Sequence, residues 1–586
     1  MTQHATYSHA APQPALDPIV LALVQNRLDY ISRHMGWVMT RTARSPIFSQ
    51  SHDFSCFLTD PHGTLISNAD GVPIHTGGGG FAARALIKAF GDDIHDNDIF
   101  VLNDPYEAGG NHLPDWVIAR PVFVEGRLCG FTCNRAHQSD IGGGAAGTYN
   151  PEATEIFHEG IRLPPLKLVE QGKTREDLWK LLLINSRTSD ALDGDLRAMI
   201  GSCRIGGERV AALVQELGTD EALQYFEGVL SHADRRFRAA VAELPDGRYE
   251  ALEYTDGDCF EQMKIAIRVA VTIDGDGMTV DFTGSDPQIR GFKNSSVANT
   301  WSAVYMALAS FFDPDIPRNE GTFRGVQIIA PEGTIVNARP PAPMTMNTVF
   351  VAHEIVVSVW KALGQAAPKR SLAGWGKTIM GLTSSREGRT EPFVMYHWNA
   401  ASGGGAVNGR DGFSQIGHLI TLGGLTLANL ESYEQLYPMV FHKQELRVDA
   451  AGAGKFRGGP GVDYEVHIQV PANYSFRGEG IVSPTGFGEQ GGGTGAKGEM
   501  TLHLDSGEVL PAPQYGNRRY EPLTLKASSP AGGGWGNPLQ RDPALVLADV
   551  RNGILTREAA ARDYGVVLQP NTWAIDDAAT QQRRTG

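Results

Sequence analysis

The spacing of apolar residues changes several times along this chain, and each change limits what the chain can fold into. The first pattern consists of Val20, Val24, Leu28, Ile31, Met35 and Val38. Its steps of three and four residues predict a helix from Asp17-Pro18 to about Ala43, whose apolar face is either core or subunit interface. Helical spacing returns between about Thr174 and Leu244, where we expect a helical layer.

Two other regions have the short or alternating apolar runs of β-strands. Between Asp53 and Arg135 such runs predict a mixed sheet with glycine-rich loops, and they lie at residues 54–58, 99–102 and 117–124. After Gly247, runs at residues 265–273 and 278–282 predict strands of a second mixed module, with a helix at residues 352–363. The sequence therefore predicts an α+β (mixed) fold with mixed sheets, a helical layer and glycine-rich functional loops.

The length of 586 residues is too great for one hydrophobic core and should give about three or four packed units. We expect small polar tails at both ends of the chain, and the final dozen residues are expected to be disordered. The predicted segments are a disordered tail (1–16), an N-terminal α/β region with a helical segment (17–245), a mixed α/β module (246–450), a C-terminal glycine-rich β region (451–568) and a second tail (569–586).

Charge and composition exclude several functions. The net charge of −15, with no block of Lys and Arg, argues against nucleic acid as a partner. No apolar stretch reaches the roughly 18 to 20 residues of a membrane-spanning helix, so we expect no membrane association. The start lacks a basic segment, and the apolar run 19–24 is too short for a secretion signal, which predicts a cytoplasmic protein. The five cysteines form no CxxC pair and are expected to be reduced.

Nucleotide and nucleophile motifs are also missing. Gly374-Trp-Gly-Lys377-Thr378 ends like a phosphate-binding loop, but Ser371 stands where the first glycine of that motif belongs. We therefore expect no self-contained ATP site in this chain. Without a Gly-x-Ser-x-Gly elbow or a convincing Cys-His pair, covalent catalysis is not expected either.

The most informative segment contains two His-x-x-Asp units, His112 to Asp115 and His137 to Asp140. Each follows a short apolar strand, so both units are expected on loops at strand ends, where a sheet can direct them toward one point. Imidazole and carboxylate groups are suitable ligands for Zn²⁺, Mn²⁺ or Fe²⁺, and three of them leave positions for water or substrate. Loop histidines that simply hydrogen-bond to carboxylates have the same spacing, so spacing alone leaves both interpretations open.

Several segments resemble the hydantoinase B family, which includes the B-type subunits of ATP-dependent hydantoinases, oxoprolinases and caprolactamase and the related subunits of ketone carboxylases. The matching segments are Asn103 to Asp115, Arg135 to Gly143, Ala153 to Pro164, Asp53-Phe-Ser-Cys56, Pro73-Ile-His75, Asn319-Glu-Gly321, Phe456-Arg-Gly-Gly459, Gly532 to Pro538 and Asp563-Tyr-Gly-Val566. The resemblance spans roughly residues 17 to 568.

The resemblance implies a divalent metal, Zn²⁺ or Mn²⁺ or else Fe²⁺, held by His112, Asp115 and His137. Asp140 is then either a fourth ligand or a carboxylate that orients a ligating histidine. The candidates for proton transfer, which needs an imidazole or carboxylate close to the reacting atoms, are His75, Asp140 and Glu159.

It also implies a partner, an A-type subunit that binds ATP and Mg²⁺, in a complex expected to be a heterotetramer. The partner would phosphorylate the amide oxygen of a small cyclic amide, and this subunit would hydrolyse the activated ring. Two alternatives stay open. One is a metal-dependent subunit of an ATP-dependent ketone carboxylase, and the other is a non-catalytic subunit whose metal is structural.

Overall fold

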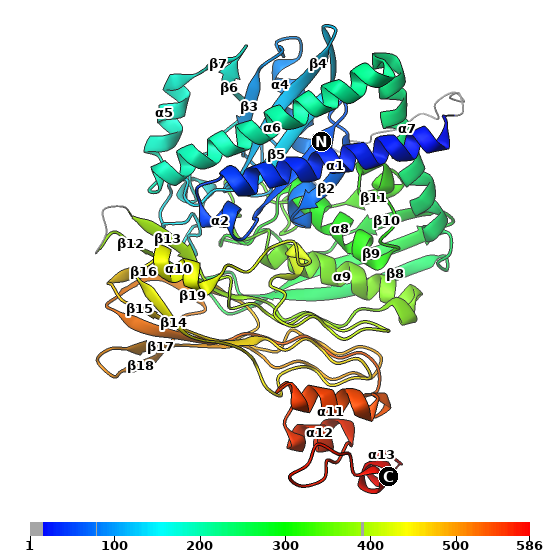
Figure 1. Cartoon of the computed structure of the whole chain (residues 1–586), viewed down its shortest axis with the longest axis vertical. Helices are drawn as coiled ribbons and strands as arrows, with labels where there is room; N and C mark the ends of the chain where they lie inside the picture. The colour runs from blue at the N-terminus through cyan, green and yellow to red at the C-terminus, as the bar shows by residue number, and fades with distance from the viewer. Residues whose placement is uncertain (1–15, 78, 388–391, 586) are drawn as a thin grey trace.

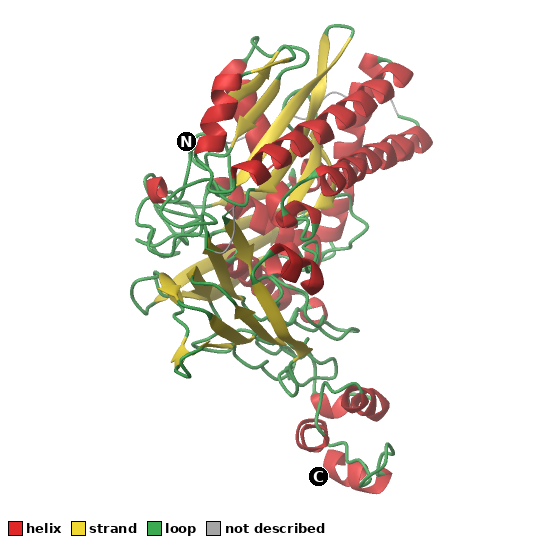
Figure 2. Ribbon diagram, turned by 60° about the vertical axis from the view of Figure 1, so that its left-hand side comes forward, coloured by secondary structure: helices red, strands yellow, loops and turns green. Residues whose placement is uncertain are grey.

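The computed structural model describes residues 16–77, 79–387 and 392–585, arranged as stacked sheets and helices with the last helices at one end (Figures 1 and 2). The predicted tail, residues 1–16, lies outside these ranges except for Leu16. The predicted α+β (mixed) fold class is confirmed, because helices and several sheets alternate along the chain. In the described ranges, no helix combines the length and the apolar character that a bilayer-spanning segment requires.

The first sheet is antiparallel throughout. In spatial order its strands are β2 (Leu65–Gly71), β1 (Phe54–Thr59), β5 (Arg127–His137), β4 (Asp115–Val124), β3 (Ile99–Leu102), β6 (Leu166–Glu170) and β7 (Lys173–Thr174). The mixed pairing expected for residues 53–135 is therefore wrong for this sheet. One cause is local: only Glu125 and Gly126 connect β4 to β5, with φ of 52° and 78°, and such a two-residue turn makes an antiparallel hairpin.

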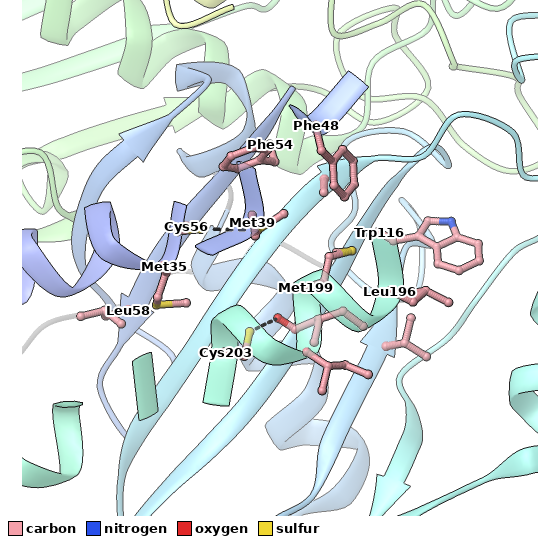
Figure 3. Packing of buried hydrophobic residues seen from close by; sticks show 14 of the residues in the cluster. Met35, Met39, Phe48, Phe54, Cys56, Leu58, Trp116, Leu196, Met199 and Cys203 are labelled. Atoms are coloured by element: carbon pink, nitrogen blue, oxygen red, sulfur yellow. Dashed lines mark hydrogen bonds between the residues drawn. The ribbon is translucent and has the colours of Figure 1, made fainter. Parts of the chain in front are cut away.

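Helices cover both faces of this sheet. On one face lie α1 (Pro18–Thr42) and α6 (Ser189–Leu217), and on the other lies α4 (Gly79–Phe90). The strand residues alternate accordingly, since Trp116 of β4 joins the core under α1 and α6 while Val117 joins the core under α4. Figure 3 shows this packing for Met35, Met39, Phe48, Phe54, Cys56, Leu58, Trp116, Leu196, Met199 and Cys203.

The long first helix begins where the sequence predicted. The side chain of Asp17 accepts a hydrogen bond from the backbone N–H of Ile19, and Pro18 occupies the first turn. Val24, Leu28 and Met35 are buried, so the apolar face of this helix is core. The predicted helical layer is confirmed by α5 (Glu176–Ile184), α6 and α7 (Thr219–Val241).

The second sheet is mixed, as predicted, because β10 and β11 pair in parallel. Its strands are β11 (Val326–Ile329), β10 (Gly277–Asp281), β9 (Lys264–Asp274) and β8 (Gly247–Asp256). Two apolar helices, α8 (Val297–Phe311) and α9 (Phe350–Ala366), pack together in the core that this sheet shares with α7.

Two antiparallel sheets form the C-terminal β region. One consists of β13 (Phe393–Tyr396), β12 (Ile379–Ser385), β16 (Ala472–Gly478) and β19 (Tyr515–Tyr520), and the other of β14 (Met439–Leu446), β15 (Val462–Ile468), β20 (Leu523–Ser528), β17 (Glu499–Leu504) and β18 (Val509–Pro511). Strands β12 and β16 pair with each other although they lie on opposite sides of the predicted module boundary at residue 450. The boundaries between the predicted modules stay predictions. Phe393 and Met395 enter the core between these sheets, whereas Val394 and Tyr396 join the core that lies under α1 and α6.

The remaining helices are short. They are α2 (Pro46–Ser49), α3 (Pro73–Thr76), α10 (Leu430–Leu436), α11 (Pro543–Arg551), α12 (Arg557–Tyr564) and α13 (Asp577–Thr585). The last of these corrects the expectation of a disordered end in the predicted tail 569–586. Thr580 in α13 is buried, and its hydroxyl accepts a hydrogen bond from the backbone N–H of Val567, so α13 is held against the chain before it.

Glycine clusters in the last third of the chain form a bundle of extended segments beneath α9 (Figure 1). Gly459 donates its backbone N–H to the carbonyl of Gly404 at 2.8 Å, and Gly532 donates to Gly459 at 2.9 Å. A Cβ on Gly532 would lie 1.9 Å from the carbonyl oxygen of Gly404. None of these three glycines has a positive φ. Glycine is therefore needed here because the peptide groups lie too close together for a side chain, and not because of the backbone conformation.

Gly532→Ala is expected to lower the free energy of unfolding by about 1–3 kcal/mol or more, because the methyl group must push two backbone segments apart. The matched control is Gly201→Ala in α6, where a Cβ meets nothing within 4 Å and the helix should gain up to about 1 kcal/mol. Thermal melts of both variants measure the difference. Equal melting temperatures would contradict a sterically closed bundle.

Candidate metal centre

Four neighbouring strands of the first sheet bring polar residues to the same end. Asp115 is the first residue of β4 and His137 the last of β5, and the antiparallel register places them directly opposite each other. Asp53 immediately precedes β1, and its backbone carbonyl accepts a hydrogen bond from the N–H of His137 at 3.0 Å. His75 lies in α3, which follows β2. Residues far apart in the sequence thus meet because adjacent antiparallel strands alternate in direction.

The three predicted metal ligands form one buried cluster, with ligand atoms of His112, Asp115 and His137 within 4.8 Å of one another. Oδ1 of Asp115 lies 2.8 Å from Nε2 of His112 and 3.2 Å from Nδ1 of His137. The other ring nitrogen of His112, Nδ1, lies 2.5 Å from the carbonyl oxygen of Thr345. This contact assigns the proton to Nδ1 and leaves Nε2 as a lone pair directed into the cluster.

Unpaired atoms in the cluster fit a bound cation. Nε2 of His112 and Oδ2 of Asp115 are buried and have no hydrogen-bond partner among the described residues, although His112 Nε2 is close to the other oxygen of Asp115. Burying such acceptors without a partner is unfavourable, and a divalent ion would satisfy both. Two imidazoles and one carboxylate are a donor set that Zn²⁺, Mn²⁺ and Fe²⁺ accept.

The electrostatics of the cluster favour an ionised carboxylate. Burial alone would raise the pKa of Asp115, but the neighbouring His112 and His75 lower it well below its usual value. Burial lowers the pKa of His137, while for His112 the contact with Asp115 outweighs burial and raises the pKa. Asp115 therefore supplies the negative charge around which the histidines gather.

His75, one of the three candidates for proton transfer, contacts this cluster. Its Nε2 lies 3.4 Å from Oδ2 of Asp115 and 3.5 Å from Oδ1 of Asp53. Burial lowers the pKa of His75 to about 4, so its imidazole is neutral near pH 7. Burial also raises the pKa of Asp53 to about 6.

The other two candidates for proton transfer have different surroundings. The carboxylate of Asp140 accepts hydrogen bonds from the N–H groups of Gly142 and Gly147 and pairs with Arg187 at 3.1 Å, which orders the loop after β5. Glu159 accepts the N–H groups of Met344 and Thr345, both at 2.8 Å. Neither carboxylate joins the three clustered residues, and their proposed part in proton transfer stays a prediction.

Sequence reasoning missed the wall beside the cluster. The ring of Tyr149 stacks on His137 with centroids 5.5 Å apart, and the hydroxyl of Tyr396 lies 3.5 Å from Nε2 of His137. Arg477 also contacts Tyr149, with its guanidinium carbon 3.2 Å from the ring centroid. Asp53 stood in a matched segment and could have been found there, but Tyr396 and Arg477 come from the distant β13 and β16.

Comparisons with known proteins show the family of this chain. The family model described as hydantoinase B/oxoprolinase matches residues 17–538. Caprolactamase subunit beta of Pseudomonas jessenii is 35% identical over 97% of this chain and 99% of its own length. The 5-oxoprolinase 1 of Arabidopsis thaliana is 28% identical over 91% of this chain, which spans 43% of that relative.

Two solved structures share the fold. The crystal structure of ATP-dependent caprolactamase from Pseudomonas jessenii matches with a TM-score of 0.87 and 34% identity, over 98% of this chain and 100% of that chain. Nucleotide-free acetone carboxylase matches with a TM-score of 0.86 over 97% of this chain and 82% of that chain, at 21% identity, which shows the fold alone. On the family model and the full-length similarity to caprolactamase subunit beta, the chain belongs to the hydantoinase B/oxoprolinase family.

Proposed function

We propose that this chain is the B-type subunit of an ATP-dependent cyclic amide hydrolase that opens hydantoin, oxoproline or lactam rings. The observation that carries the proposal is the buried cluster of His112, Asp115 and His137 in a chain similar to caprolactamase subunit beta along its whole length. The family description, which names both hydantoinase B and oxoprolinase, supports cyclic amides as the substrate class.

The proposed partner is an A-type subunit that binds ATP and Mg²⁺, in a heterotetramer. An ATP-binding site on a second subunit is needed because the sequence of this chain contains no phosphate-binding loop. This chain spans only 43% of 5-oxoprolinase 1, so that relative has room for a second unit in the same polypeptide. In the proposed reaction the partner transfers the γ-phosphoryl group to the amide oxygen. Water then attacks the activated carbon, and the ring C–N bond breaks as the nitrogen takes up a proton, which leaves an acyl phosphate. A second water hydrolyses this acyl phosphate to the carboxylate and releases inorganic phosphate.

The cluster residues have separate tasks in this proposal. A divalent ion held by His112, Asp115 and His137 would act as a Lewis acid and lower the pKa of bound water toward about 7. The carbonyl of Thr345 fixes the tautomer of His112, and one oxygen of Asp115 lies close to a ring nitrogen of both His112 and His137, where a shared cation would bind all three residues. The neutral imidazole of His75, in contact with Asp115 and Asp53, accepts the proton of the attacking water.

The second candidate function is ATP-dependent ketone carboxylation, favoured by the fold shared with acetone carboxylase. A hydrolase requires only substrate, ATP and water, whereas a carboxylase consumes bicarbonate and builds its carbon into the product. Labelled bicarbonate in the assay distinguishes the two. A purely structural subunit, the third candidate, would leave ring opening unchanged when the cluster is disrupted.

His112→Ala and His137→Ala are each expected to abolish binding of a divalent metal and ATP-dependent ring opening together, because each variant removes one ligand from the cluster. Elemental analysis of the chain purified with its coexpressed partner, combined with assays on lactams and hydantoins, measures both. The matched control is His95→Ala, a half-exposed histidine that pairs with Asp93. Activity that survives loss of the metal would place the chemistry elsewhere.

His75→Gln is expected to keep the metal and lower kcat for ring opening by about 10²–10⁴-fold, the usual range for a general base. The reason is that His75 contacts Asp115 without belonging to the proposed ligand set. Ser55→Ala serves as control, since Ser55 touches only the other ring nitrogen, Nδ1, at 3.4 Å. An unchanged kcat in the His75 variant would remove it from proton transfer.

Glu159 is proposed as a positioning residue, since it holds the N–H of Thr345, whose carbonyl orients His112. Burial raises the pKa of Glu159 from 4.5 to about 7, so the unfolded chain loses this proton at a lower pH than the folded chain. The free energy of unfolding should therefore fall as pH rises between about 5 and 7. In Glu159→Gln this contribution is absent. Urea unfolding at both ends of that range checks it, and the same pH dependence in both proteins would contradict it.

A further inference from the structure

Arg477 is a buried cation without a counter-charge. It lies in β16, its side chain is 0% exposed, and its three guanidinium nitrogens have no hydrogen-bond partner within the described part of the chain. Its contacts are instead aromatic, with the guanidinium carbon 3.2 Å from the ring centroid of Tyr149 and 5.7 Å from that of Tyr396. Burying a charge in this way is unfavourable unless another group neutralises it.

Other buried cations in this structure do have partners. Lys293 pairs with Glu479 at 2.6 Å, and Lys377 pairs with both Glu479 and Glu354. Arg541 contacts Asp411 at 2.6 Å and Asp549 at 2.8 Å. Arg135, also buried, donates hydrogen bonds to the backbone carbonyls of His75 and Gly109 and to Oδ1 of Asn111. Arg477 differs from all of these cations, and its unsatisfied donors point to a ligand.

Arg477 shares a strand with residues that line a cavity. Along β16 the side chains alternate, so Asn473, Ser475 and Arg477 share one face. Asn473 and Ser475 line a cavity of about 410 Å³. Three arginines of that cavity pair with carboxylates, Arg187 with Asp140, Arg518 with Glu152 and Arg519 with Glu387, whereas Arg477 has no such partner among the described residues.

Arg477 and the cluster share two aromatic neighbours. Tyr149 contacts the guanidinium carbon at 3.2 Å and stacks on His137 with centroids 5.5 Å apart, and the ring of Tyr396 lies 5.7 Å from the guanidinium carbon and 5.8 Å from the ring of His137. The guanidinium group is therefore a near neighbour of the proposed metal ligand His137.

We propose that Arg477 binds the phosphoryl group of the activated substrate while the reacting carbon lies at the cluster of His112, Asp115 and His137. This inference rests on the proposed function, in which the amide oxygen carries a phosphoryl group. The planar guanidinium binds two phosphate oxygens at once, and the dianion supplies the missing counter-charge. After ring opening the same group leaves as inorganic phosphate, which makes phosphate the probe for this site.

The test is phosphate binding to the full chain after removal of metals by chelation, followed by thermal melts and calorimetry. Phosphate is expected to raise the melting temperature of the wild-type chain, and Arg477→Met should weaken phosphate binding by at least about tenfold. Without phosphate this variant should melt no lower than wild type, because the unpaired buried charge is gone. Arg477→Lys keeps the positive charge but loses the planar guanidinium group that binds two oxygens, so we expect a phosphate affinity between those of wild type and Arg477→Met.

Arg541→Met is the matched control, because it removes a paired buried arginine and should lower the melting temperature while leaving phosphate affinity unchanged. Acetate in place of phosphate tests for a carboxylate site. Three results would contradict the proposal: no phosphate binding by the wild-type chain, phosphate binding by Arg477→Met as tight as by wild type, or acetate binding to wild type as tight as phosphate binding. Arg477-dependent phosphate binding without any ring opening would keep the anion site and overturn the proposed function, whereas ring opening with phosphate affinity independent of Arg477 would overturn only the anion site.

Discussion

The site depends on the contacts of one buried carboxylate, that of Asp115, with three histidines. An ionised carboxylate in the interior is unfavourable unless several groups share its charge, and here one oxygen faces His112 and His137 while the other faces His75. These contacts exist only because Asp115 and His137 are paired across β4 and β5, so a slip of one residue in that register would point one of them to the opposite face. The tight turn at Glu125 and Gly126 and a one-residue register shift between Val122 and Phe123 together set this register.

The C-terminal β region completes the site that the N-terminal sheet begins. In β13 neighbouring residues divide between two cores, with Met395 in the C-terminal β region and Tyr396 against His137. In β16 the same alternation turns Arg477 toward Tyr149. The wall of the site therefore depends on how these two parts of the chain pack together, and a change in that packing would alter the site without touching any of the clustered histidines.

Much of this could be predicted where the pattern was local. The capped first helix, strands β1 and β3 and the pair of His-x-x-Asp units were visible in short stretches of sequence. Helix α8 was missed because it is buried on most sides and lacks a polar face, which removes the helical period from its sequence. Asp140 and Glu159 resemble the clustered residues in residue type and neighbourhood, and only three-dimensional contacts show that their carboxylates lie outside the cluster and accept hydrogen bonds from backbone N–H groups. Arg477 stands in an ordinary alternating strand, and its missing partner is a property of the fold alone.

The bundle of extended glycine segments is a core made of main chain. In an ordinary core a damaging substitution can be compensated by a smaller neighbour, because side chains share the available volume. Between Gly404, Gly459 and Gly532 there is no side chain to shorten, and the peptide groups already touch. A second substitution nearby therefore cannot compensate for a side chain at these positions, and glycine is required there for geometric reasons that are independent of the reaction.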